Sequence, residues 1–126
     1  MITAVLFQEG NDLTGCRIEG HSGWADAGHD IVCAAASILG CTCVNALESV
    51  CGVIPSITEY NEQKGALAFE LPEMTEAENE KAQILMKALK QGLSDLADAY
   101  PQNVTLSIKE RRKQQPGVDP ASQPSR

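Results

Sequence analysis

One thiol and one imidazole stand in an arrangement that could support nucleophilic catalysis. His21 follows a predicted strand, and Cys33 comes twelve residues later, near the start of an apolar helix. A helix N-terminus lowers the pKa of a cysteine thiol. A neighbouring imidazole can take the thiol proton and return it to a leaving amine, while free N–H groups of the first turn can serve an oxyanion. These residues predict a Cys-His site, with Asp30 capping the helix, orienting the imidazole, or both.

Each of these residues also has a structural interpretation. Cysteine is among the most often buried residue types, so Cys33 on its residue type alone would be a small core residue. His29 is a rival base that is closer in sequence, but we expect a solvated loop residue there. Ser37 lies one helical turn past Cys33 and either supports the site or packs. Trp24, the only tryptophan, either anchors a substrate side chain or packs against the helix.

The other four cysteines are expected to fill the core. Cys41 and Cys43 are two residues apart, and such residues point to different sides of a helix, which argues against a shared tetrahedral zinc site. The five cysteines are odd in number, and four of them lie in one 19-residue stretch, so the disulfide framework of a secreted protein is not expected. We predict no metal and no cofactor, with Cys16, Cys41, Cys43 and Cys51 as small apolar residues of a protein in a reducing compartment.

The composition indicates one globular domain with an acidic body. The 126 residues are 43% hydrophobic and 21% charged, close to the globular average. We expect no secretory leader and no apolar run long enough to span a bilayer. The net charge is −7, of which residues 109–126 contribute +3 and residues 1–108 contribute −10. Such a body repels phosphate backbones and attracts cationic peptides, so neither nucleic acid nor a membrane is an expected partner.

Hydrophobic periodicity and turn signals predict the elements that must position these residues. Strands are predicted over residues 2–8, 13–20, 53–60, 66–71 and 103–108. One helix is predicted from Ile31 to Val50 after the Asp30 cap, with Gly52 as its C′ glycine. A second helix opens with a Thr75-x-x-Glu78 capping box and runs to about Tyr100. Its apolar stripe is Ala82, Leu85, Met86, Leu89, Leu93, Leu96, Ala97 and Tyr100.

The order β-β-α-β-β-α-β predicts an α+β fold in which two helices pack on a small, mostly antiparallel sheet. Cys16 and Ile18 are expected on one face of the second strand. The glycine-rich segment between Gly20 and His29 predicts a flexible loop. Residues 1–108 are expected to form one domain, and the polar and basic residues 109–126 a disordered tail.

The segment from Gly20 to Ser37 resembles the motif of the ribosomal-processing cysteine protease family, Prp. The resemblance lies in a Gly-His pair, a glycine-containing loop, and the run Asp30-Ile31-Val32-Cys33-Ala34-Ala35-Ala36-Ser37. The chain length and the element order are similar too, so the resemblance covers nearly everything except the tail. Ser22 stands where the family has Ala, and neither this residue nor His29 removes the Cys-His pair.

The resemblance implies a cytoplasmic cysteine endopeptidase that forms homodimers. By matching position, Cys33 would be the nucleophile, His21 the general base, Asp30 an accessory carboxylate and Ser37 a helper. The family removes the N-terminal extension of a large-subunit ribosomal protein, the one numbered twenty-seven, cutting after an aromatic residue and so supporting ribosome assembly. The mobile substrate-binding loop implied for this chain includes Gly20, Ser22, Gly23, Trp24 and Gly28.

Two other classes of protein share part of this pattern. A ribosome-associated binding or assembly factor would keep the fold without turnover, although a binder does not need a thiol at a helix N-terminus. A thiol-based redox or acyl-transfer protein would use Cys33 with a second cysteine, although no Cys-x-x-Cys is present. The sequence favours the peptidase over both.

Overall fold

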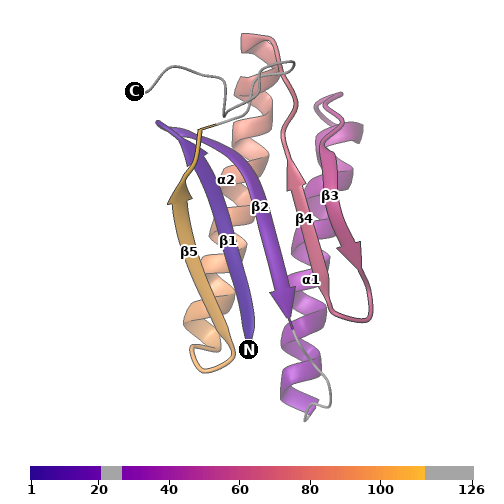
Figure 1. Cartoon of the computed structure of the whole chain (residues 1–126), viewed down its shortest axis with the longest axis vertical. Helices are drawn as coiled ribbons and strands as arrows, with labels where there is room; N and C mark the ends of the chain where they lie inside the picture. Colours follow the sequence, from indigo (N-terminus) through magenta and orange to yellow (C-terminus); the bar gives the residue numbers. More distant parts are fainter. Residues whose placement is uncertain (21–26, 113–126) are drawn as a thin grey trace, which may run out of the picture.

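A computed structural model describes residues 1–20 and 27–112 of the chain. Its elements are β1 (Ile2–Glu9), β2 (Asp12–Gly20), α1 (Ala27–Ser49), β3 (Ser56–Asn61), β4 (Ala66–Glu70), α2 (Glu76–Ala99) and β5 (Val104–Glu110). This order confirms the predicted α+β fold (Figure 1). The predictions for His21, Ser22, Gly23 and Trp24, and for the tail beyond residue 112, lie outside the described residues.

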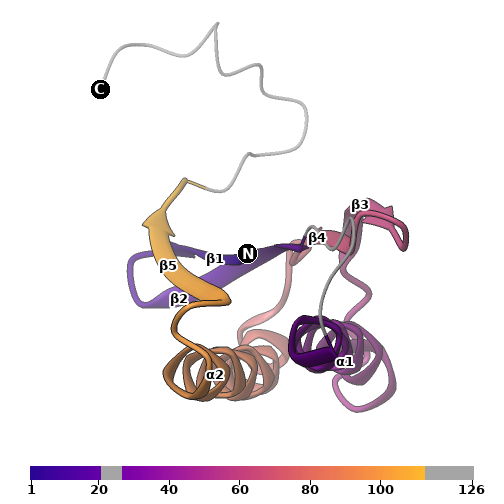
Figure 2. The same cartoon turned by 90° about the horizontal axis from the view of Figure 1, so that it is seen from below.

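Five strands form one mixed sheet in the order β3-β4-β2-β1-β5. All neighbours are antiparallel except β1 and β5, which run parallel with Ile2 opposite Val104. Figure 2 shows both helices on the same face of this sheet, α1 beneath β4 and β3 and α2 beneath the side that holds β5. The two helices therefore cover one face of the sheet between them.

The helix-covered face carries the aliphatic core. Ile2, Ala4 and Leu6 of β1 point to it and are at most 1% exposed. On β2, Cys16 pairs with Leu6 and Ile18 with Ala4, so both turn to the same side, as predicted. The period-two alternation of a half-covered strand explains this arrangement.

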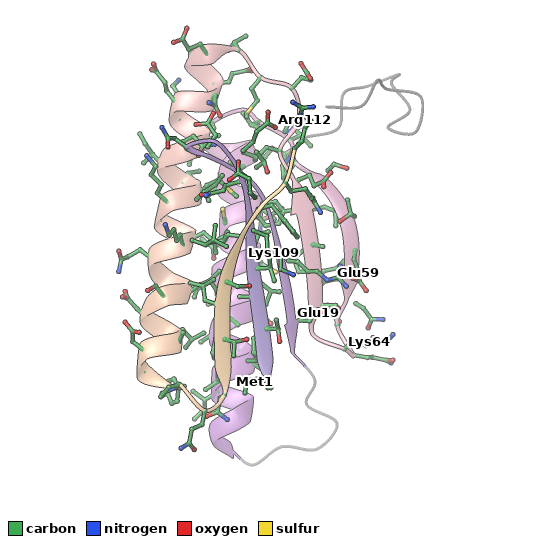
Figure 3. All side chains as sticks on the ribbon, turned by 60° about the vertical axis from the view of Figure 1, so that its left-hand side comes forward. Met1, Glu19, Glu59, Lys64, Lys109 and Arg112 are labelled. Atoms are coloured by element: carbon green, nitrogen blue, oxygen red, sulfur yellow. The ribbon has the colours of Figure 1, made fainter. Side chains whose placement is uncertain are left out.

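The uncovered face of the sheet carries charged side chains beside a few small apolar ones such as Val5 and Ala68. Arg17 of β2 forms ion pairs with Glu19 on its own strand and with Glu59 on β3, the latter at 2.8 Å. Glu19 and Glu59 are labelled in Figure 3, which also shows Lys64 at the tip of the β3–β4 hairpin. Charged side chains on this face are consistent with a sheet that buries only one side.

Helix α2 begins and ends where the sequence predicts. The Thr75 hydroxyl accepts from the Glu78 N–H at 3.1 Å, and the Glu78 carboxylate accepts from the Thr75 N–H at 2.9 Å. Tyr100 is the C-cap and is 40% exposed, so it belongs less to the apolar stripe than predicted. The remaining stripe residues are buried or pack against the core: Ala82, Leu85, Met86, Leu89, Leu93, Leu96 and Ala97.

Helix α1 begins earlier than predicted. It starts at Ala27, so Asp30 is inside the helix and is not its N-cap, and Gly28 and His29 are helical instead of forming part of a loop. A glycine in the first turn costs little helical stability, because the N–H groups there lack helical partners anyway. At the other end Gly52 adopts φ +69°, and its N–H donates to the Glu48 carbonyl at 3.0 Å, as a C′ glycine should.

The outer side of α1 is apolar and exposed. Residues Ile31–Ser49 are long and apolar enough to cross a membrane by length and composition alone, contrary to our expectation for the sequence. The inner side packs into the core through Val32, Ala36, Cys43 and Leu47. On the outer side Ile31 is 61% exposed and Ile38 is 64% exposed. One side of this helix thus packs into the core, and its outer side is not covered by the described residues.

The folded body extends past the boundary predicted at residue 108. Strand β5 continues to Glu110, and the Arg111 N–H donates to the Gln8 carbonyl at 2.8 Å. The Arg111 guanidinium lies 3.8 Å from the Phe7 ring centroid and pairs with the Glu70 carboxylate. Cation–π and ion-pair contacts therefore fix residues that composition alone assigned to the tail.

Gln83 is a buried polar residue that the periodicity did not reveal. Its side chain accepts from the Leu13 N–H and donates to the Leu13 carbonyl, both at 2.8 Å. It thereby joins α2 to the start of β2 and satisfies two backbone groups that water does not reach.

Replacing Gln83 should destabilise the fold more than replacing an exposed glutamine of the same helix. Q83A leaves the Leu13 N–H and carbonyl without these partners, which costs about 2–3 kcal/mol. Q91A removes only an exposed bond to Asp95 and should cost under about 0.5 kcal/mol. Urea unfolding of both variants measures the difference, and equal midpoints would contradict the role assigned to Gln83.

Candidate active site

Cys33 lies where α1 passes the end of β2. It comes six residues after the first residue of the helix and is half-buried. Its Sγ is 3.7 Å from the point that a Cβ on Gly20 would occupy. Gly20 is the last residue of β2 and is buried. The thiol is therefore in contact range of the end of a strand, at the edge of the sheet's helix-covered face.

The early start of α1 corrects one part of the predicted chemistry. With the helix beginning at Ala27, Cys33 is in its second turn and not its first. The unpaired N–H groups belong to the first four residues, and the dipole effect declines within the first turn. The prediction that these N–H groups lie at Cys33 to activate the thiol and hold an oxyanion is therefore wrong.

A pocket of about 130 Å³ opens beside Cys33. Ser37 shares it, since residues four apart stand on one side of a helix. Glu62 and Gly65, from the turn between β3 and β4, form the opposite wall. The structure thus brings together Cys33, Ser37 and Gly20 among the predicted site residues. It adds Glu62, which no motif had indicated.

A second pocket, of about 260 Å³, continues the first along α1. The two pockets have five lining residues in common, namely Ile18, Ala36, Ser37, Glu62 and Gly65. Cys41 and Tyr60 line only the second pocket. Together the pockets form one groove, which we call the Cys33 groove, with α1 as one wall and the β3–β4 hairpin as the other.

A glycine contact holds the hairpin wall of the groove in place. The Gly20 N–H donates to the Gly65 carbonyl at 3.2 Å. Gly65 has φ +63°, and a Cβ there would come within 2.8 Å of the Gly20 carbonyl oxygen. The Lys64 N–H donates to the Asn61 side chain at 3.1 Å and closes the turn. Only glycine satisfies both the backbone angle and the close approach at position 65.

Burial separates the remaining cysteines into two kinds. Burial raises the pKa of Cys16 to about 12 and that of Cys43 to about 11, which confirms both as core residues. The Cys43 Sγ lies 3.9 Å from the Met86 Sδ on α2. Cys41 is partly buried and packs against the core while also lining the groove, so it fills the core only in part, and Cys51 is likewise partly buried. Cys41 and Cys43 lie on different sides of α1, as their spacing predicts.

A larger cavity, of about 450 Å³, lies at the other end of β2, where α2 begins. Carboxylates dominate its walls, among them Glu9, Asp12, Glu73 and Glu76. None of its described lining residues is a cysteine or a histidine. The Cys33 groove is smaller but has a nucleophile, and we therefore take it as the candidate active site.

A half-buried cysteine at one end of an open groove, on an α+β domain, is the arrangement expected of a thiol hydrolase that acts on an extended chain. The comparisons with known proteins point to the same class. A model of the family described as cysteine protease Prp matches residues 1–105. The chain therefore belongs to the cysteine protease Prp family.

Two curated relatives are both named ribosomal processing cysteine protease Prp. The protein from Staphylococcus aureus (strain Mu50 / ATCC 700699) is 27% identical over 110 residues, which cover 86% of this chain and 100% of that protein. The protein from Bacillus subtilis (strain 168) is 30% identical over 92 residues, which cover 72% of this chain and 81% of that protein.

Solved structures share the fold. SMU.848 from Streptococcus mutans is 34% identical with a TM-score of 0.79, over 88% of this chain and 96% of that one. The essential ribosomal processing protease Prp from S. aureus, in complex with a substrate peptide, is 27% identical with a TM-score of 0.73, over 86% of this chain and 100% of that one. A further structure of the S. aureus protease has a covalently linked product peptide.

The thiols should differ in reactivity as their burial dictates. At pH 8 a thiol of pKa about 12 is ionised to a fraction on the order of 10⁻⁴, and one of pKa about 11 to about 10⁻³. Iodoacetamide should therefore modify Cys41 long before Cys16 or Cys43 in the folded protein, and all three alike in guanidinium chloride. Mass spectrometry of tryptic peptides over time measures the order. Equal rates for Cys16 and Cys41 in the folded protein would contradict it.

Proposed function

We propose that this protein is a cysteine endopeptidase that removes the N-terminal extension of the large-subunit ribosomal protein numbered twenty-seven. The cut falls after an aromatic residue, and the reaction serves ribosome assembly in the cytoplasm. The observation that supports this most directly is the half-buried Cys33 at one end of a groove that two adjoining pockets form between α1 and the β3–β4 hairpin. The relatives named ribosomal processing proteases support the substrate class.

In this proposal Cys33 is the nucleophile and His21 the general base. The Cys33 Sγ attacks the scissile carbonyl carbon, and the carbonyl electron pair moves to oxygen. His21 takes the thiol proton and delivers it to the departing amine, after which water hydrolyses the acyl-enzyme. His21 is bonded to Gly20, whose Cβ position is 3.7 Å from the thiol sulfur.

The remaining roles belong to groups near this pair. Asp30 comes three residues before Cys33 in α1, a spacing that puts two residues on one side of a helix. We assign it the accessory carboxylate that orients the imidazole. Ser37 lines the groove and contributes a hydroxyl to the bound peptide. The activation that a helix N-terminus would have supplied then falls to His21 and Asp30.

The substrate-binding loop is the segment that follows Gly20. We assign to it Ser22, Gly23 and Trp24, with the Trp24 ring contacting an apolar residue of the substrate. Gly28, also assigned to the loop from the sequence, is in α1, so it borders the loop at the helix start.

We further propose that the protein is a homodimer through the outer face of α1. Ile31 and Ile38 are exposed there, and the sequence has no charged residue from Ile31 to Leu47. A second copy would cover this apolar face, as oligomer interfaces usually do.

Cleavage of a peptide that spans the extended N-terminus tests the assignment of the nucleophile. Wild type should cut it after the aromatic residue, while C33A and H21A should each lose at least about 10³-fold in kcat/KM. C51A removes a partly buried thiol outside the groove and should retain activity. Mass spectrometry over time follows the product. Binding without cleavage by wild type would instead favour a ribosome assembly factor.

Assembly can be tested with matched charge insertions on the two helices. I38E introduces a carboxylate into the outer face of α1, and I84E does the same at a similarly exposed isoleucine of α2. Light scattering on a sizing column should give a dimer mass for wild type and I84E, and a monomer mass for I38E. A dimer in all three would exclude this face as the interface.

A further inference from the structure

The Cys33 groove contains one carboxylate. Among the described residues that line its two pockets, Glu62 is the only Asp, Glu, Lys or Arg. The Tyr60 hydroxyl donates to the Glu62 Oε1 at 2.8 Å and so orients the carboxylate. This hydrogen bond is the first cause of a raised pKa for Tyr60, which keeps the phenol protonated as a donor.

Glu62 has acceptor capacity that the described residues leave unused. The ion pairs of the described residues are those of Arg17 and Arg111, and none involves Glu62. A carboxylate has about four acceptor positions, and the Tyr60 hydroxyl occupies one of them. A ligand in the groove can therefore donate hydrogen bonds to Glu62.

The groove below this carboxylate is apolar. Ile18, Ala36 and Leu67 are at most 8% exposed and line the second pocket. A pocket with apolar walls and one carboxylate at its rim suits a side chain with a hydrocarbon stem and a cationic head. The volume of about 260 Å³ is large enough for the stem of a lysine or an arginine. The acidic body, at −10 for residues 1–108, favours the same ligand over long range.

The length of the groove relates the second pocket to the position of the scissile bond. Cys33 and Cys41 are eight residues apart on one helix, which is about 12 Å. An extended peptide advances about 3.3 Å per residue. The second pocket, which lies between these two levels, therefore corresponds to a substrate residue two to four positions from the bond attacked by Cys33.

We propose that Glu62 is a specificity-determining residue that selects substrates with a lysine or arginine two to four residues from the scissile bond. The inference rests on the proposed function of the groove as a peptidase site and adds the chemistry of one substrate position. Tyr60 is the positioning residue that holds the carboxylate toward the groove.

A peptide series tests this directly. The cleavable peptide is made with lysine, norleucine or glutamate at each position within four residues of the scissile bond, and kcat/KM is measured for wild type, E62Q and E62K. At one of these positions wild type should prefer lysine over norleucine by roughly three- to tenfold. E62Q should bring that ratio near one, and E62K should make the glutamate peptide the better substrate.

The matched control is E73Q, which removes the same charge from the acidic cavity at the far end of the molecule. E73Q should keep the wild-type lysine-to-norleucine ratio at the selective position. A distant charge contributes only to the long-range attraction of the acidic body, which acts on all peptide positions alike. Two results would overturn the inference about Glu62: a lysine-to-norleucine ratio near one at every position in wild type, or a ratio that E62Q leaves unchanged. Cleavage of the peptides in the same experiment would still support the peptidase function.

Failure of the peptidase can be separated from failure of the subsite. If no peptide is cut, the Kd of the same series on C33A protein, from fluorescence anisotropy, still measures the preference. Tighter binding of the lysine peptide in C33A than in C33A/E62Q supports the subsite. Equal affinities in the two proteins reject it.

Discussion

The contact between Gly20 and Gly65 is the constraint on which the candidate site depends. It joins the end of β2 to the turn of the β3–β4 hairpin by a backbone hydrogen bond of 3.2 Å. Gly20 lies beside the Cys33 thiol, and Gly65 belongs to the hairpin wall of the groove. Because both partners are backbone, the distance between the end of β2 and the hairpin wall is set by the fold and not by a side-chain rotamer. A Cβ at Gly65 would collide with the Gly20 carbonyl and widen the groove.

The same segment explains why Glu62, at the hairpin turn, lines one pocket with Cys33 although the two are twenty-nine residues apart in sequence. Strand β4 pairs with β2 and returns from the turn alongside it, with Ala66 opposite Glu19. The turn must therefore lie beside Gly20. Antiparallel pairing thus brings an acidic turn, an apolar strand end and a cysteine of α1 to one corner of the domain.

Most of the fold could be predicted from the sequence, because local rules and the tertiary structure agree. The Thr75 capping box and the Gly52 C′ position were correct, since both are satisfied by backbone groups close in sequence. The errors came where a contact distant in sequence decided the outcome. Arg111 is fixed by Phe7 and Glu70, and Gln83 is buried by Leu13, and neither pairing is visible in a window of neighbouring residues.

The candidate site was predictable only in part, for the same reason. Cys33, Ser37 and Gly20 were found from spacing within one segment, and the structure brings them together. The start of α1 was misplaced, because Asp30 is a good cap by residue type while the chain before it is also helical. Glu62 gave no signal, since a glutamate in a polar turn has the pattern of any solvated residue. Its position against the groove depends on strand register, which composition does not encode.

The shift of the helix start changes the surroundings of Cys33. The thiolate of a cysteine in the first turn would be stabilised by the helix dipole and by unpaired N–H groups. A nearby carboxylate would oppose this effect, because it disfavours a second negative charge. In the second turn the stabilisation by the helix is small, because the N–H groups there have helical partners. The proposed pair of Cys33 and His21 does not depend on it, because the imidazole takes the thiol proton during the attack. In that proposal the Glu62 carboxylate, the one charged group among the described residues that line the groove, is left to accept hydrogen bonds from the substrate.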